Sequence, residues 1–157
     1  MSIATSVERR LNQMGVKYDV IWHHHTSSST YTAQAAHVPG EQLAKCVMLE
    51  DDRGYVMAVL PAARKVDLGA LHRRLGRELG LATEREFARL FADCEPGAIP
   101  PLGDAYGIDT IVDGSLVGKQ DIYFESGDHC ALVHVSGADF LRLMGDAPRD
   151  TISAPRH

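Results

Sequence analysis

The residues best suited to chemistry lie in a proline-rich loop, residues 94–103, which holds three of the seven prolines and two of the fourteen glycines. Gly97 can take a positive φ without steric cost, and the prolines that follow keep the chain extended. We therefore predict a stiff apolar turn in which free backbone N–H groups of Gly97, Ala98 and Ile99 could hold a carbonyl oxygen. For the loop alone, a rigid connector between a helix and a strand is the commoner explanation.

Lys45 is the most informative single residue. Alternation along the strand predicted over residues 45–50 places it on one face with Val47 and Leu49, and that face is apolar. Its ammonium either reaches solvent at the rim or points into a cleft. In a cleft it would be a fixed cation for an ester carbonyl or a phosphate, with a pKa lowered by desolvation. Taken alone, the exposed rim is favoured.

Histidines offer a weaker signal. In the tract His23-His24-His25, neighbouring strand residues point to opposite faces, so only His23 and His25 could share a metal ion. No HExxH spacing organises the others, and we predict no metal and no cofactor. His129 follows Gly-Asp in a tight turn. Either this is ordinary turn chemistry, or the imidazole faces substrate at the mouth of the sheet.

Three cysteines, Cys46, Cys94 and Cys130, are odd in number and lack CxxC spacing. This argues against a disulfide framework or a structural zinc site and predicts a reducing, cytoplasmic setting. Cys46 or Cys94 could pair with His129 as nucleophile and base. Nothing in the local sequence would lower either thiol pKa, so buried core cysteines are favoured.

The charge pattern limits the partners. Arg73 and Arg77 would be neighbours on a predicted helix and could contact phosphates, although a solvated helix face is more common. The net charge of −5 argues against non-specific binding to nucleic acid such as DNA. No apolar run approaches the roughly 20 residues of a membrane span, so no membrane partner is predicted.

The elements that position these residues are typical of one α/β (α+β-like) domain with a mixed, mostly antiparallel sheet flanked by helices. Capping residues and helical periodicity predict the main helices over residues 5–14, 68–79, 83–91 and 137–144. Apolar stretches predict strands over residues 18–23, 45–50, 55–60, 110–112, 121–125 and 130–135. The domain is expected to span residues 1–145, followed by a flexible tail over 146–157.

Four motifs appear in a characteristic order: TYTAQAA at 30–36, QLAK at 42–45, PGAIPPLG at 96–103 and GDH at 127–129. In this order and spacing they resemble the YbaK/ProX family of trans-editing aminoacyl-tRNA deacylases. The same domain occurs as the editing insertion of bacterial prolyl-tRNA synthetases. The resemblance runs from about Val7 to Met144, nearly the whole chain.

The resemblance implies roles for individual residues. Lys45 would hold the 3′-terminal adenosine and the aminoacyl ester, and backbone groups of the loop from Gly97 to Pro101, with Gly97 and Ala98 catalytic, would position the aminoacyl carbonyl. Family members need neither a metal nor a nucleophilic side chain, because water attacks the ester with help from a ribose hydroxyl of the tRNA. The residues implied to bind substrate are Cys46, Ile99, Pro100, His129, Tyr31 and Ser28.

The implied function is therefore hydrolysis of mischarged aminoacyl-tRNA at its acceptor end, a step of translation quality control. A synthetase or an elongation factor is a further partner in this view. Cys46 stands where alanine-specific members carry asparagine, which argues against an alanyl-tRNA assignment. Two alternatives from other classes are a non-catalytic module that binds a nucleotide, tRNA or synthetase, and a metal hydrolase built on His23, His25 and another histidine.

Overall fold

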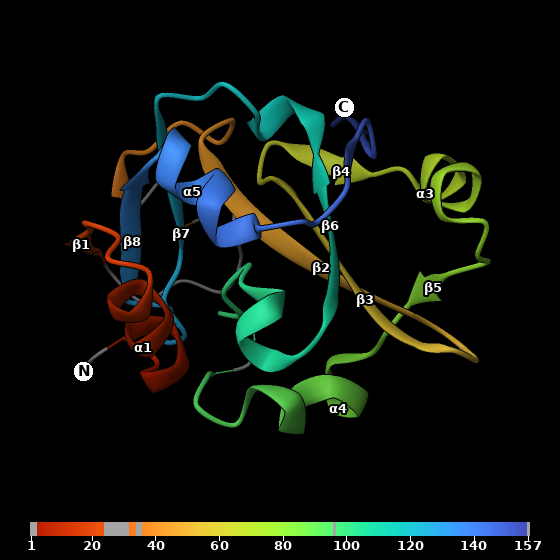
Figure 1. Ribbon diagram of the computed structural model, residues 1–157, viewed down its shortest axis with the longest axis horizontal. Coiled ribbons are helices and arrows are strands. Elements are labelled where there is room, and N and C mark those ends of the chain that lie inside the picture. The colour runs from red at the N-terminus through yellow and green to blue at the C-terminus, as the bar shows by residue number, and fades with distance from the viewer. Residues whose placement is uncertain (1–2, 24–31, 34–35, 96, 157) are drawn as a thin grey trace.

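A mixed sheet of eight strands organises the computed structural model, which describes residues 3–23, 32–33, 36–95 and 97–156 (Figure 1). The strand order is β1-β8-β7-β2-β3-β6-β9, with β5 paired to β2, and a second sheet joins β10 to β4. The bounds are β1 Asp19–Trp22, β2 Leu43–Asp51, β3 Gly54–Pro61, β4 Arg64–Val66, β5 Gly80–Leu81, β6 Asp109–Asp113, β7 Asp121–Glu125, β8 Ala131–Ser136, β9 Arg149–Asp150 and β10 Ser153–Pro155.

Helices pack on both faces of this sheet. Figure 1 shows α1 (Thr5–Gln13) beside β1 and β8, and α3 (Leu68–Leu75) on the other side of the molecule near β4 and β5. The other helices are α4 (Glu84–Phe87), α5 (Gly137–Met144) and the 3₁₀ turns η1 (Ala88–Phe91), η2 (Gly103–Tyr106) and η3 (Gly114–Leu116). Among the described residues, no helix has the length and apolar character that crossing a bilayer requires. The prediction of one α/β domain with a mixed sheet is confirmed.

Local capping chemistry explains where three helices begin. The Asp67 carboxylate accepts the Ala70 N–H ahead of α3, and the Ser136 hydroxyl accepts the Asp139 N–H ahead of α5. Thr83 and Glu86 form a reciprocal capping box at α4. Each cap satisfies backbone N–H groups that the first helical turn leaves without partners.

The two faces of the sheet carry separate cores. Ala44 and Met48 of β2 pack into the core that contains α1 and α5. Val47 and Leu49 pack into the other core, beneath α3. This alternation agrees with the register predicted for the strand that begins at Lys45.

One edge of β2 has two different neighbours. Parallel β7 pairs with it at Leu43 and Ala44, and antiparallel β5 pairs with it at Leu49 and Glu50. The Met48 carbonyl accepts the Ala82 N–H at 3.0 Å, so the stretch of this edge that the described strands leave without a partner is residues 45–47. Backbone and side-chain groups of β2 are therefore accessible from that side.

The C-terminal segment corrects a prediction. We expected a flexible tail over residues 146–157, but β9 pairs with β6 and β10 pairs with β4. Ile152 is fully buried, and its N–H donates to the Asp113 carboxylate at 2.9 Å. The segment lacks periodicity because these pairings are only two or three residues long and depend on strands far away in sequence.

Candidate functional site

A cavity of about 320 Å³ opens at the unpaired stretch of β2, and we call it the Lys45 cavity. Four predicted site residues line it together, although more than 50 positions separate the two segments that supply them: Lys45, Cys46, Gly97 and Ile99. The remaining lining residues come from β2, β5 and the residue after it, the start and end of α4, and the end of β7: Val47, Met48, Leu81, Ala82, Glu84, Phe87 and Glu125.

Gly97 is fitted closely to His129. Its φ of +80° lies in the left-handed region, and a Cβ built on it would come within 3.0 Å of His129 Cε1 and 3.4 Å of Nε2. Both the conformation and the space therefore require glycine. The structure thus brings together the glycine of the proline-rich loop and the histidine of the GDH motif.

The turn that carries His129 is held by one carboxylate oxygen. Asp128 Oδ1 accepts the N–H groups of Cys130 at 2.9 Å and Ala131 at 3.0 Å, and the Ser126 hydroxyl at 3.3 Å. These bonds fix a backbone in which His129 has a φ of 60°, which is uncommon for a residue other than glycine. His129 is buried beside the loop in a set orientation.

We predicted free backbone N–H groups at Gly97, Ala98 and Ile99, but those of Gly97 and Ala98 already have partners. The Gly97 N–H donates to a carboxylate oxygen of Glu84, at the start of α4. The Ala98 N–H donates to the Glu95 carbonyl at 3.1 Å and so closes a turn. Ala98 and Pro100 are buried and are not among the residues that line the cavity. The Gly97 N–H therefore donates into the cavity, to a carboxylate oxygen of the lining residue Glu84.

The cavity changes the acidity of the groups around it. Burial lowers the pKa of Lys45, and the nearby Arg156 guanidinium lowers it further. Burial raises the pKa of the Cys46 thiol to about 12, and this thiol donates to the Ile99 carbonyl at 3.4 Å. Burial also raises the pKa of Cys94 to about 12. Neither thiol is set up as a thiolate nucleophile.

Glu125 is the main feature of the site that sequence reasoning missed. Its side chain is only 3% exposed, and burial raises its pKa to about 7, while a hydrogen bond from Thr32 acts in the opposite direction. Its Oε2 atom has no hydrogen-bond partner among the described residues. The sequence carried no clear signal, because a carboxylate at the end of a short strand is ordinarily solvated.

Several predicted residues lie outside the described part of the chain: Ser28, Tyr31, His24, His25 and Pro96. His23 is described, and its backbone N–H donates to the Cys130 carbonyl at 2.9 Å. Over residues 3–23, 32–33, 36–95 and 97–156, no three His, Cys, Asp or Glu side chains converge in a way that could hold a metal ion.

The predicted arginine pair is not formed. Gly76, with a φ of 64°, ends α3 after Leu75, so Arg77 lies beyond the helix while Arg73 is exposed on it. The Arg77 guanidinium makes two bonds to Asp51, with Nε at 2.7 Å from Oδ2 and Nη2 at 2.5 Å from Oδ1. Arg77 is thus already paired, and the expectation of two helix-face neighbours was wrong.

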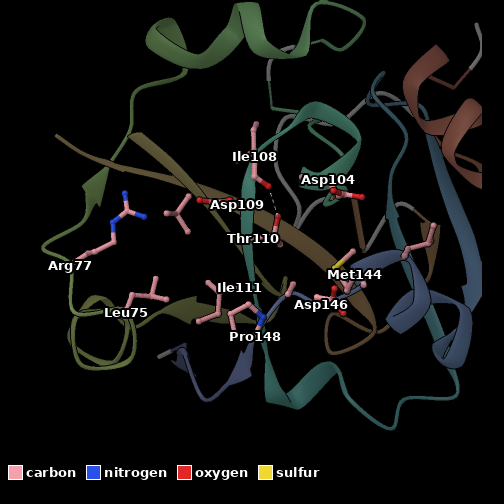
Figure 2. Close-up of a pocket in the computed structure, with 15 residues that line it drawn as sticks. Leu75, Arg77, Asp104, Ile108, Asp109, Thr110, Ile111, Met144, Asp146 and Pro148 are labelled. Atoms are coloured by element: carbon pink, nitrogen blue, oxygen red, sulfur yellow. Dashed lines mark hydrogen bonds between the residues drawn. The ribbon is translucent and has the colours of Figure 1, made fainter. Parts of the chain in front are cut away.

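A second and larger cavity, of about 540 Å³, lies along β6, and we call it the Asp109 cavity. In the view of Figure 2, β6 runs through the middle, with Leu75 and Arg77 on one side and Met144 and Asp146 on the other. The Thr110 hydroxyl donates to the Ile108 carbonyl at 3.0 Å. Arg77 is the only residue predicted for a functional site that lines this cavity among the described residues.

Comparison with known proteins places the chain in a family. Residues 23–143 match the family described as the aminoacyl-tRNA editing domain, and the chain belongs to that family. The match includes Lys45, the proline-rich loop and His129. No curated protein matches the chain significantly.

Solved structures share the fold. A candidate trans-editing enzyme for prolyl-tRNA synthetase has a TM-score of 0.81 and 23% identity, covering 98% of this chain and 99% of its own. A hypothetical protein has a TM-score of 0.83 and 21% identity over 95% of this chain and 99% of its own. A candidate signal transduction protein from Marinobacter aquaeolei VT8 has a TM-score of 0.78 and 23% identity, covering 98% of this chain but only 31% of its own.

Proposed function

We propose that this protein hydrolyses the ester bond of mischarged aminoacyl-tRNA in trans and releases the amino acid and intact tRNA. Membership of the aminoacyl-tRNA editing family supports an aminoacyl-tRNA substrate. The observation that carries the proposal is that Lys45, Gly97 and Ile99 line one cavity within the matched region, with His129 against Gly97.

In this proposal Lys45 binds the 3′-terminal adenosine and the ester. The Gly97 N–H, which donates to a Glu84 carboxylate oxygen in the free protein, would donate to the ester carbonyl oxygen once the substrate displaces Glu84. Ala98 and Pro100 are both buried, and in this proposal their packing fixes the position of the loop. Ser28 and Tyr31 remain predicted contacts of the aminoacyl group.

The proposed reaction uses neither a metal ion nor a nucleophilic side chain. A water molecule attacks the carbonyl carbon, the bond from that carbon to the ribose oxygen breaks, and the ribose oxygen takes up a proton. An aminoacyl ester is already activated, so orientation and a polarised carbonyl can supply much of the rate increase. The neutral, buried thiol of Cys46 is consistent with this route.

The shape of the cavity would set the amino-acid specificity. A volume of about 320 Å³ is at the small end of ligand cavities, which suits an aminoacyl group and part of its ribose. Apolar walls such as Phe87 and Ile99 exclude larger side chains well but discriminate poorly against smaller ones. Cys46 lines the same space and stands where alanine-specific members carry asparagine, so a substrate other than alanine is part of the proposal.

Of the two arginines that the sequence suggested as contacts to tRNA phosphates, we propose only one. Arg73 is exposed and remains a candidate phosphate contact, whereas Arg77 is committed to Asp51. Arg73→Ala should weaken tRNA binding and flatten its salt dependence. An unchanged salt slope would exclude Arg73 from the interface. A synthetase or elongation factor that delivers the tRNA is compatible with this arrangement.

The test is deacylation of alanyl-, seryl-, threonyl-, cysteinyl- and prolyl-tRNA by the wild type, Lys45→Ala and Lys65→Ala. Lys65 is an exposed lysine of β4 and serves as the matched control. We expect the wild type and Lys65→Ala to hydrolyse one or two species and Lys45→Ala to hydrolyse none. If the wild type hydrolyses none of the five, a non-catalytic binding module becomes the better explanation. Loss of activity with a chelator would favour a metal hydrolase.

A further inference from the structure

Glu125 raises a question that the proposed roles of Lys45 and Gly97 leave open. Its carboxyl group lies in the wall of the Lys45 cavity, 3% exposed, with a hydrogen bond from Thr32 and no partner for Oε2 among the described residues. A buried polar atom without a partner costs about 1–3 kcal/mol. Such an atom in the wall of a cavity lacks a partner that a bound ligand could supply.

The charges of the cavity are separated rather than paired. Lys45 and Glu125 both line it, yet among the described residues no ion pair joins them and neither shifts the pKa of the other. Burial and then Arg156 lower the pKa of Lys45, whereas a carboxylate paired with its ammonium would raise that pKa. The cavity lining therefore provides three separate polar groups: the Lys45 ammonium, the Glu125 carboxyl group and the Gly97 N–H. This pattern fits a ligand whose own positive and negative ends are separated.

We propose that Glu125 binds the α-ammonium group of the aminoacyl ester, and so selects esters with a free amino group over hydroxyacyl or N-blocked esters. This inference rests on the proposed function. In an aminoacyl ester the ammonium lies two bonds from the carbonyl carbon, so one bound group can present its carbonyl oxygen to Gly97 and its ammonium to Glu125. Charge-assisted hydrogen bonds of this kind are among the stronger ones in proteins.

The surroundings of Glu125 favour this role over the other carboxylate of the cavity. Glu84 is partly exposed, and its carboxylate already accepts the Gly97 N–H, the group that the substrate carbonyl would use. Glu125 instead has an acceptor atom with no other use. The nearby His129 also lowers the Glu125 pKa somewhat against the larger effect of burial, and a bound ammonium would favour the ionised form further.

A substrate–enzyme cycle tests the proposal. The full chain and its Glu125→Gln variant, which keeps the shape of the side chain, are assayed on the tRNA species that the panel identifies. Each is also assayed on the matching hydroxyacyl-tRNA, in which a hydroxyl replaces the amino group. We expect Glu125→Gln to lower kcat/KM roughly 10- to 100-fold on the aminoacyl substrate and less than about threefold on the hydroxyacyl substrate. Glu84→Gln should change both substrates by the same factor.

A binding measurement separates this inference from the proposed reaction. Calorimetry measures the affinity of the wild type and Glu125→Gln for 3′-aminoacylamino-3′-deoxyadenosine, an amide that is not hydrolysed, and for its analogue without the amino group. Preference for the free amine in the wild type, lost in the variant, supports the inference even if no ester is cleaved. Equal losses on both substrates, no loss at all, or no preference in binding would overturn it, even if the wild type is an active deacylase.

Discussion

The two cavities differ more in how their polar groups are satisfied than in their size. The Asp109 cavity is the larger, about 540 Å³ against about 320 Å³, and two of its charged residues, Arg77 and Asp104, are held in ion pairs. Arg10 Nη1 lies 2.6 Å from Asp104 Oδ2, and Arg77 is bound by Asp51. The Lys45 cavity contains an unsatisfied Glu125 oxygen, and its lining residue Gly97 packs against His129, a residue other than glycine that has a φ of 60°.

We assign the proposed function to the Lys45 cavity on this difference rather than on volume. Strained backbone and unsatisfied buried groups cost stability, so they persist where a ligand or a reaction compensates for them. The Asp109 cavity lies where β6, α5 and the segment before β9 meet (Figure 2). Experiments that alter the two cavities in matched ways should therefore give different results.

The largest expected effect on kcat/KM comes from Gly97→Ala, and Gly107→Ala is its control. Gly97→Ala and Gly107→Ala each place a side chain at a positive φ, +80° and +70°, at a cost of about 1–2 kcal/mol of stability. Only Gly97→Ala also brings a Cβ against His129 and shifts the N–H that would hold the carbonyl. We expect a drop in kcat/KM of about 10²- to 10³-fold for Gly97→Ala and almost none for Gly107→Ala.

Both variants should be compared by thermal unfolding and by deacylation of the same tRNA. Similar losses in unfolding temperature with very different losses in activity would assign the loop to the reaction. Equal activity in the two variants would show that the proline-rich loop is only a connector, as its composition alone had suggested.

The next effect is a change in the pH dependence of stability. The folded-state pKa of Glu125 is raised by burial from an ordinary 4.5 to about 7, so its protonated form stabilises the fold below pH 4.5, and this contribution is lost as the pH rises through 7. The shift corresponds to about 3 kcal/mol. Glu125→Gln cannot ionise and should be more stable than the wild type at pH 8 but not at pH 4.5. Urea unfolding at pH 8 and at pH 4.5 measures the difference in stability between the two proteins. If that difference is the same at both pH values, the raised pKa of Glu125 is contradicted.

The parts of the fold that sequence reasoning predicted well depend on near neighbours. The caps at Asp67, Thr83 and Ser136 form within three residues, so their chemistry is visible in the sequence. The end of the helix after Asp67 was placed too late because Gly76 and Gly80 are both plausible terminators, and the structure uses Gly76. The pairings of β9 and β10 had no local signal at all.

The site divides in the same way. Lys45 and Gly97 could be predicted because each lies in a motif of the sequence, and the structure places both in one cavity. Glu125 is unusual only because the chain around it excludes water, which no single segment reveals. Arg77 was predicted to contact phosphate, but its guanidinium pairs with Asp51. Because Asp51 lies 26 positions earlier, the local sequence does not reveal this pair. Motifs thus indicate which residues to expect, while packing decides how their charges are used.

A smaller effect is expected at the ion pair beside the Asp109 cavity. Hydrogen bonds from Arg77 hold the pKa of Asp51 down to about 2, so the ionised carboxylate stabilises the fold above its ordinary pKa of 3.8, and this contribution is lost as the pH falls toward 2. Asp51→Asn should lower the unfolding temperature at pH 7 and have less effect at pH 3. Its deacylation activity should equal that of the wild type. A loss of activity at unchanged stability would make the Asp109 cavity part of the site.

The smallest expected effect is at Cys46, and it tests whether the Lys45 cavity works without a nucleophile. The thiol donates to the Ile99 carbonyl at 3.4 Å, and burial raises its pKa to about 12, so it is neutral at pH 8. Cys46→Ala removes one weak hydrogen bond, worth about 0.5–1.5 kcal/mol, and should lower kcat/KM only about two- to tenfold. Cys46→Ser should lose less, because a hydroxyl can also donate to Ile99. A loss of a thousandfold or more in both variants, with rapid alkylation of the wild-type thiol by iodoacetamide, would instead make Cys46 the nucleophile. In that case the unsatisfied groups of the cavity would serve covalent catalysis, and Glu125 would have to be reconsidered as a partner of the thiol.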